Sequence, residues 1–306
     1  MSSCTVIDET ADTSASCAAA SPVRAALISA SMTAADSFVL LATSLSGEAV
    51  ERVRKLHAGA VPEDLHKLRV ALRRLRTLWW AYEPVLGKKE AKLQRREFKS
   101  LADAAGRTRD WDVARELIAA AHAHASNKHS FAALIEAIDE HRAEALSFSL
   151  KAIGNAGVER ILEQAMGCAR QDLDAQGAAR PIARFAEERV QVAEDALKKR
   201  VKHAVSADGS DYAALHEVRI AGKKFRYLLQ FFAPVLDSDH QAVIERLTVV
   251  QDELGTLNDQ VTSEALLREY AFQLGNAKLV KQAIAYLHSE TAHHMQHVHE
   301  VLHTVR

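Results

Sequence analysis

The segment from Leu65 to Leu86 reads LHKLRVALRRLRTLWWAYEPVL, and the segment from Leu215 to Leu236 reads LHEVRIAGKKFRYLLQFFAPVL. The second segment repeats the first without a gap at an offset of 150 residues. The alignment pairs His66 with His216, Arg69 with Arg219, Arg73 and Arg74 with Lys223 and Lys224, Arg76 with Arg226, and Pro84 with Pro234. The repeat preserves a pattern of positive charge, and it favours a chain built from two similar halves.

Helical geometry gathers the basic residues of each segment into one stripe. At about 100° per residue, a helix that begins near Pro62 places these side chains within roughly 80° of one another. The first stripe contains His66, Arg69, Arg73 and Arg76, with Arg74 turned away. Leucines and Trp79 occupy the adjoining sector, so the helix buries one side and borders it with positive charge. The second stripe contains His216, Arg219, Lys223 and Arg226.

The two stripes are nearly free of acidic residues. Solvated helix faces usually mix charges at i to i+4 spacing, because opposite charges attract and like charges repel there. A solvated face is the alternative interpretation of any charge run. A chain that repeats the unfavourable pattern is better explained by an anionic ligand that offsets the repulsion.

Composition predicts an all-α protein. The chain has 306 residues and 48% hydrophobic content, with only 12 glycines and 5 prolines, and no convincing strand pattern. The net charge is −1, yet residues 52–109 hold 16 Lys or Arg against 6 Asp or Glu. This distribution predicts a local positive field on a nearly neutral protein, which suits selective binding of an anion.

The chain lacks the usual features of exported or membrane proteins. Its three cysteines, Cys4, Cys17 and Cys168, suggest no disulfide framework, and a reducing, cytoplasmic compartment is expected. The first residues are polar and acidic without an apolar core of a secretory signal. No apolar run long enough to span a bilayer occurs.

Residues that typically begin or end helices predict the order of the elements along the chain. Residues 1–22 are expected to form a disordered tail, followed by one half over about 23–155 and a second over about 156–306. A helix is expected from Val23 to about His57, with a possible break near 44–47. Another, over 88–105, carries a second basic stripe of Lys92, Arg95, Arg96 and Lys99 and ends at Gly106 in a left-handed conformation. The turn 106–110, reading GRTRD, has a partner GTLND at 255–259, so helices are expected over 239–254 and 259–274.

The repeated LHKLRVALRRLR and LHEVRIAGKKFR motifs, the PVL endings and the GRTRD and GTLND turns together resemble the conserved histidine α-helical domain, or CHAD, family. The resemblance covers about 24–305. It implies two pseudo-symmetric four-helix bundles, a basic central pore and a non-catalytic module that binds inorganic polyphosphate, in some members at polyphosphate granules. Granule-associated proteins are then possible partners. With the second basic stripe included, the expected ligand-binding residues are His66, Arg69, Arg73, Arg74, Arg76, Arg96, Lys99, Arg109, His216, Arg219, Lys223, Lys224 and Arg226.

Other functions stay open at this point. Nucleic acid is the second candidate ligand, although the nearby aromatics, Trp79, Trp80, Phe231 and Phe232, are interpreted mainly as core. A Mg²⁺-dependent phosphohydrolase would need Asp110, Asp112 and Asp259 as ligands, whereas helix capping is the simpler role for these acids. The histidines at 288, 293, 294, 297, 299 and 303 are interpreted as a solvated helix face, because the sequence places no carboxylate or cysteine at a good spacing for a metal site, with metal binding as the alternative. His66 and His216 could accept phosphoryl groups, but bonding to phosphate or a structural contact is preferred. No cofactor is expected.

Overall fold

The computed structural model describes residues 28–59, 62–124, 131–175, 179–207, 211–237 and 240–304. These residues form helices and connecting turns, with one isolated bridge between Thr33 and Pro181. The helices are α1 (Ala34–Ala58), α2 (Pro62–Ala81), α3 (Lys88–Ala104), α4 (Arg107–His124), α5 (Ala132–Ala156), α6 (Val158–Ala175), α7 (Ile182–Ser206), α8 (Tyr212–Phe232), the short 3₁₀ helix η2 (Ala233–Val235), α9 (Gln241–Glu269) and α10 (Ala277–Thr304). The all-α prediction is confirmed.

The first helix begins later than predicted and has no break near residues 44–47. α1 begins at Ala34, where the side chain of Thr33 accepts a hydrogen bond from the Asp36 amide and Asp36 accepts one from the Thr33 amide. This reciprocal capping box satisfies amides that have no partner inside the helix. The helix then continues through Gly47 without a break, because the buried face on either side packs against the core. The expected start at Val23 is therefore wrong for residues 28–33, and the predicted tail lies outside the described residues.

The two halves differ in one respect: two helices of the first half correspond to one continuous helix in the second. In the first half, Gly106 lies between α3 and α4, whereas in the second half the matching Gly255 lies inside the unbroken helix α9. The expected break at 255–259 is therefore wrong. Gly106 also lacks the predicted left-handed conformation, since the described glycines with φ in the left-handed region are Gly157 and Gly275. Gly157, with φ of 63°, separates α5 from α6.

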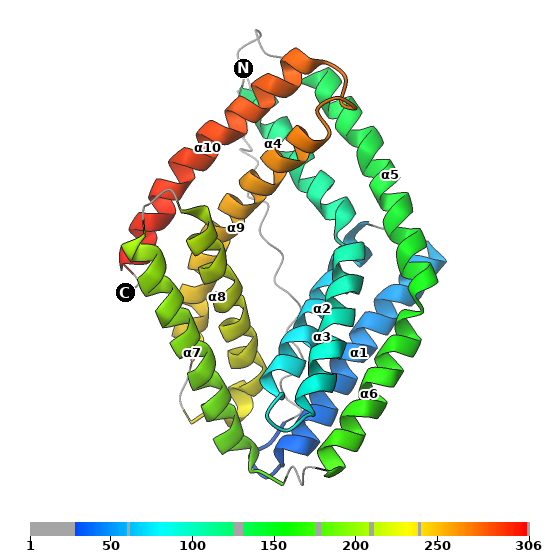
Figure 1. The fold of residues 1–306 in the computed structure, drawn as a ribbon, viewed down its shortest axis with the longest axis vertical. Coiled ribbons are helices and arrows are strands. Elements are labelled where there is room, and N and C mark those ends of the chain that lie inside the picture. Colours follow the sequence, from blue (N-terminus) through cyan, green and yellow to red (C-terminus); the bar gives the residue numbers. More distant parts are fainter. Residues whose placement is uncertain are drawn as a thin grey trace, which may run out of the picture.

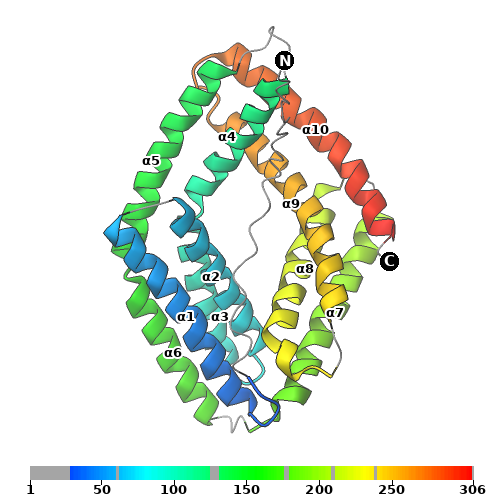
Figure 2. The ribbon, with the colours of Figure 1, turned by 180° about the vertical axis from the view of Figure 1, so that it is seen from behind.

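The helices form an elongated diamond in which the halves face each other (Figures 1 and 2). α2 packs against α1 and α3, and α8 packs against α7 and α9 in the same manner. The halves meet where α2 contacts α8 and where α4 contacts α9. α6 packs against α1 and α3, although the second half was expected to begin near residue 156. The repeated helices α2 and α8 therefore lie side by side at the junction of the halves.

An aromatic cluster joins the halves below this junction. The ring of Phe38 lies 4.9 Å from that of Trp79, and the ring of Tyr82 lies 4.7 Å from that of Phe185 on α7. Tyr82 and Ser37 share a buried hydrogen bond of 2.8 Å between their hydroxyls, and burial raises the pKa of the tyrosine. Such packing fixes α2 in position, because aromatic side chains bury a large apolar area in a specific geometry.

No described helix combines the length and hydropathy that crossing a bilayer requires. Cys168 on α6 is partly exposed and has a free thiol, while Cys4 and Cys17 lie outside the described residues.

Candidate basic site between α2 and α8

The basic stripes of the two halves meet in one place. Arg73 of α2 acts electrostatically on Arg219 and on Lys223 of α8, and Arg69 also acts on Arg219. Arg226 lies on the same side of α8 and acts on Lys223. Cations of the two stripes, more than 140 positions apart in the sequence, therefore form one cluster. We call Arg69, Arg73, Arg219, Lys223 and Arg226 the basic cluster.

Lys223 shows how strongly the cluster concentrates charge. Burial lowers the pKa of its ammonium group to about 6, and the neighbouring Arg73, Arg219 and Arg226 act in the same direction. Removing a cation from water disfavours its charged form, and like charges nearby add to this effect. The free protein therefore holds a lysine that is readily neutral near physiological pH, and an anion placed beside it would restore its charge.

Several polar atoms of the site are buried without a hydrogen-bond partner among the residues that the structure describes. They are Nε of Arg219, Nε of Arg226 and Nδ1 of His66. Burial also lowers the pKa of the Arg219 guanidinium, and Arg73 contributes to this shift. A buried donor without an acceptor is costly. These atoms are therefore available for an acceptor that the protein itself does not supply.

Two carboxylates lie next to the cluster, one from each half. Asp110 lies in the first turn of α4 and Asp259 inside α9, and each acts on Arg69. The side chain of Asp110 is exposed, yet the protein around it desolvates the carboxyl enough to raise its pKa against the lowering effect of Arg69. Capping is the wrong role for Asp259, because it lies in the interior of a helix. Both carboxylates partly neutralise the cluster in the free protein.

His66 and His216, the matching histidines of the two repeated segments, have different surroundings. His66 is half-buried, and burial followed by the nearby charge of Arg109 lowers its pKa. His216 instead has the hydroxyl of Tyr212 at 3.4 Å from Nδ1, and that hydroxyl donates to Asn258 at 3.3 Å. Asn258 takes the place of Arg109 in the second half, so the exchange removes one positive charge there. The site is pseudo-symmetric in backbone but not in charge.

A second group of cations from several helices surrounds Lys224, next to the basic cluster. Burial lowers the pKa of Lys224, and Arg76, Arg200 and Arg95 follow as causes in that order. The ammonium group of Lys224 lies 5.1 Å from the ring of Trp80, and the guanidinium of Arg189 lies 5.0 Å from the same ring. Our sequence-based site lacked Arg95, Arg189 and Arg200. Arg95 was on the predicted second stripe, but nothing in the sequence of α7 indicated Arg189 and Arg200.

Three expected site residues are not members of the basic cluster, although Arg226 acts electrostatically on one of them, Arg74. Arg74 is only 4% exposed and its Nη1 lies 3.7 Å from a carboxylate oxygen of Glu48 on α1. Lys99 forms an ion pair with Asp103 of its own helix, and Arg96 is exposed on α3. Among the described residues, neither Arg96 nor Lys99 has a recorded interaction with the cations of α8.

The aromatic residues near the basic helices are mostly core. Trp79 is 1% exposed, and Phe231 and Phe232 are fully buried, which confirms their interpretation. Trp80 is partly buried between two cations. No flat aromatic surface therefore lies among the residues of the basic cluster.

Metal sites are not formed by the described His, Cys, Asp and Glu residues, since no group of three or more gathers suitably. Asp112 forms an ion pair with Arg142 instead of joining Asp110 and Asp259. Two of the C-terminal histidines have a carboxylate of another helix beside them, which their own segment of sequence does not indicate. Glu253 of α9 lies 3.3 Å from Nε2 of His294 and 3.7 Å from Nε2 of His297, because α10 packs along α9.

The fold and this cluster define a class: an all-α protein with an internal repeat that gathers cations from both halves at their junction. A family model for the CHAD domain matches residues 44–268, and the chain belongs to the CHAD domain family. No curated protein sequence matches it.

Two solved structures share the fold. The crystal structure of the CHAD domain from the plant Ricinus communis is 23% identical with a TM-score of 0.77, and the match covers 91% of this chain and 94% of that chain. The structure of PptA from Streptomyces chartreusis is 16% identical with a TM-score of 0.67, and the match covers 89% of this chain and 99% of that chain. At these identities the likeness shows the fold alone.

Proposed function

We propose that this protein binds inorganic polyphosphate through the basic cluster, with the two halves holding a single ligand chain in a central pore. The observation that carries the proposal is the position of Lys223, which is partly buried and is acted on by the charge of Arg73 of the other half and of two arginines of its own helix. Such a cluster is unfavourable without an anion. A linear polyanion relieves the repulsion at every position that it passes.

The chemistry of the side chains suits phosphate oxygens. Arginine offers a planar fork of donors to two oxygens, and lysine offers a compact charge. Polyphosphate carries about one negative charge per phosphate unit, and residues one helical turn apart lie about 5.4 Å from one another, so successive arginines can follow a flexible chain. The unpaired Nε atoms of Arg219 and Arg226 add donors that a phosphate oxygen would satisfy.

The expected site residues contribute to different degrees in this proposal. The basic cluster makes the main contacts, while Arg76, Lys224 and Arg109 extend them and His66 and His216 bond to phosphate. Arg74 is assigned a structural role, because it is already paired with Glu48 on the buried side of α2. Arg96 and Lys99 supply long-range attraction from α3.

Polyphosphate fits better than nucleic acid for a structural reason. A protein that binds single strands without reading sequence usually offers aromatic rings on which bases stack. Trp79, Phe231 and Phe232 are buried in the core and cannot serve in that way. A ligand that consists only of phosphates needs no such surface.

The protein acts as a non-catalytic binding module in this account, and a place at polyphosphate granules follows from its ligand. Asp110 and Asp259 neutralise the arginines in the free protein, and they release them when phosphate arrives. Hydrolysis would need a metal ion held by at least these two acids, and Asp112 is engaged elsewhere.

A calorimetric titration with polyphosphate tests the proposal. We expect saturable binding at low ionic strength that weakens steeply as salt rises, because bound cations are released when the polyanion is neutralised. A single-stranded DNA of equal total charge should bind far more weakly. Equal affinity for the DNA, or no binding of polyphosphate at low salt, would refute the assignment. Release of phosphate on addition of Mg²⁺ would refute the non-catalytic part alone.

A further inference from the structure

The first half contains a helix for which the second half shows no counterpart. α6 packs against both α1 and α3, next to α2, and so completes a bundle with them (Figure 2). In the second half, α7 and α9 both pack on α8, but no described helix fills the position between α7 and α9 that corresponds to that of α6. α10 approaches this region only through its last turns, which include Leu302.

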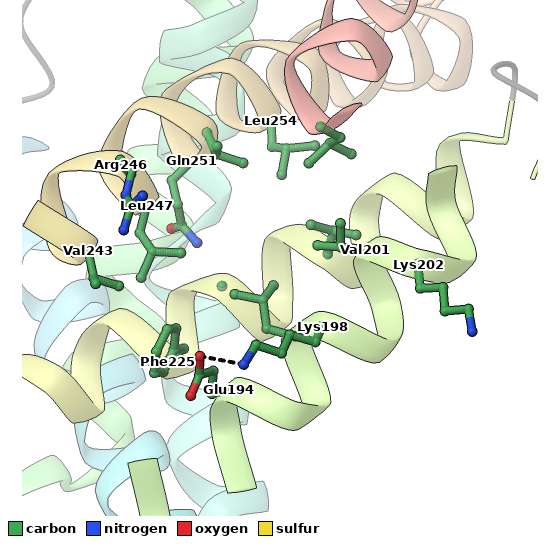
Figure 3. Close-up of a pocket in the computed structure, with 15 residues that line it drawn as sticks. Glu194, Lys198, Val201, Lys202, Phe225, Val243, Arg246, Leu247, Gln251 and Leu254 are labelled. Carbon is green, nitrogen blue, oxygen red and sulfur yellow. Dashed lines mark ion pairs between the residues drawn. The ribbon is translucent and has the colours of Figure 1, made fainter. Parts of the chain in front are cut away.

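A cavity of about 430 Å³ lies at this position (Figure 3). Its walls are apolar and come from α7, α8 and α9, with Val201, Phe225, Leu247 and Leu254 among the lining residues. The register that aligns Gly106 with Gly255 places Leu247 at the position of Phe98. Phe98 is fully buried beneath its bundle, whereas Leu247 is only partly buried. The second half thus leaves uncovered a face that the first half buries.

The charges at the edge of this groove also follow from the repeat. α1 and α7 each have 25 residues, and aligning their ends matches the buried Val53 with the partly buried Val201. The same register matches Arg54 with Lys202. In the first half, Nε of Arg54 lies 3.2 Å from Oε1 of Glu159 on α6. Arg54 therefore helps to hold the covering helix.

Lys202 has no such partner. It lines the groove and forms no ion pair within the described part of the chain, and Arg246 on the opposite side is likewise unpaired there. Lys198 is engaged with Glu194 of its own helix at 2.7 Å (Figure 3). The groove consequently offers an apolar floor between two free cations, which complements a helix with one apolar face and acidic borders.

We propose that the groove between α7, α8 and α9 is a docking site for an amphipathic, acid-bordered helix of another protein. The docked helix takes the position that α6 takes in the first half, with its apolar face on Val201, Phe225 and Leu247 and a carboxylate on Lys202. An amphipathic helix in an apolar groove is a common mode of peptide recognition. A second copy of this chain is a poor occupant, because its helix of this type, α6, is already packed in its own first half. The site would let a polyphosphate-binding protein recruit a partner.

The test uses a helix whose packing on such a face is known. A fluorescent peptide with the sequence of α6, Val158–Ala175, carrying Cys168→Ser against oxidation, is titrated with the full chain and followed by anisotropy. We expect saturable binding. Leu247→Glu and Lys202→Glu in the protein should each weaken binding at least about tenfold, as the loss of an apolar contact or a charge-assisted bond implies. A peptide with Glu159→Lys should recover affinity for the Lys202→Glu variant.

Two control variants separate the groove from other surfaces. Lys199→Glu reverses a neighbouring exposed charge of α7 outside the groove and should leave affinity unchanged. Arg54→Glu should also leave it unchanged, since a loss there would mean that the peptide displaces α6 in the first half. Circular dichroism and melting temperature confirm that each variant is folded. Absence of saturable binding, or equal sensitivity to Lys199→Glu, would overturn the proposal. So would sedimentation showing a dimer that Leu247→Glu dissociates, because the groove would then hold a second copy.

Discussion

Nη1 of Arg69 occupies the space that a Cβ atom at Gly106 would need. The same Nη1 donates a hydrogen bond of 3.1 Å to the carbonyl of Ala102, near the end of α3. The glycine at the start of the GRTRD motif is therefore required by the arginine of the basic stripe. This contact ties the position of a ligand-binding cation to the junction between α3 and α4.

Gly106→Ala should displace the Arg69 guanidinium and weaken polyphosphate binding. The end of an arginine side chain moves easily, so we expect little loss of stability but the loss of one ligand contact, which amounts to roughly tenfold in affinity. Titration calorimetry measures the effect. In an Arg69→Ala background the same glycine substitution should change affinity little. If Gly106→Ala lowered the affinity for polyphosphate just as much in that background, Gly106 would act through the backbone instead.

Binding should weaken as pH rises above the pKa of Lys223. In the free protein this pKa is about 6, so near neutral pH most molecules must take up a proton when an anion binds. The affinity should therefore decrease with increasing pH, and calorimetry in buffers of different ionisation enthalpy should detect the proton uptake. Lys223→Arg keeps its charge at all these pH values and should remove this part of the uptake. Proton uptake that is unchanged in Lys223→Arg would assign it to other groups, such as His66.

Lys223→Met should stabilise the free protein. The pKa of Lys223 is lower in the folded state than in the unfolded chain. Between about pH 6 and the ordinary pKa of lysine, the unfolded chain therefore binds one more proton than the folded protein. The folded state consequently becomes less stable as pH falls across that window. A buried apolar replacement commonly gains about 1–4 kcal/mol. The gain in melting temperature should be larger near the lower end of the window than at its upper end. A lower melting temperature at every pH would contradict this.

Asp110→Asn and Asp259→Asn should each tighten polyphosphate binding. Both carboxylates act on Arg69 and repel an incoming anion, so their removal should raise affinity about fivefold, corresponding to a charge interaction of ~1 kcal/mol. Asp112→Asn serves as the control, because Asp112 is paired with Arg142 away from the cluster. If these two acids bound a metal ion needed for the ligand, their removal would weaken binding instead.

The local pattern of the sequence predicts much of this molecule. The periodicity of 65–86 and 215–236 gives the two basic helices, their buried faces and the sides that carry charge, since these depend only on helical geometry. The absence of strand patterns gives the fold class. Arg73 and Lys223 were predicted to belong to two stripes, and the packing of α2 on α8 brings their charges together.

Features that depend on tertiary packing were missed or misjudged. Gly255 suggested a helix break by analogy with Gly106, but a glycine costs only about 1 kcal/mol within a helix, and the packed residues on either side keep α9 continuous. The need for a glycine at position 106 comes from the side chain of Arg69, 37 positions away, which no local pattern reveals. Arg189 and Arg200 approach the site from α7, where no motif marks them. Asp259 resembles a capping residue in sequence and lies in a helix interior in the structure.

The central claim is that both halves bind one ligand. Titration calorimetry with a short polyphosphate chain tests it by comparing the wild type with Arg73→Glu in the first half, Lys223→Glu in the second, and Lys278→Glu on the exposed surface of α10 as a control of equal charge change. We predict one ligand per chain for the wild type and the control, and a loss of affinity of at least about 100-fold in each single reversal with helicity unchanged. Two ligands per chain, with each reversal removing one and leaving the other at full affinity, would contradict the shared site.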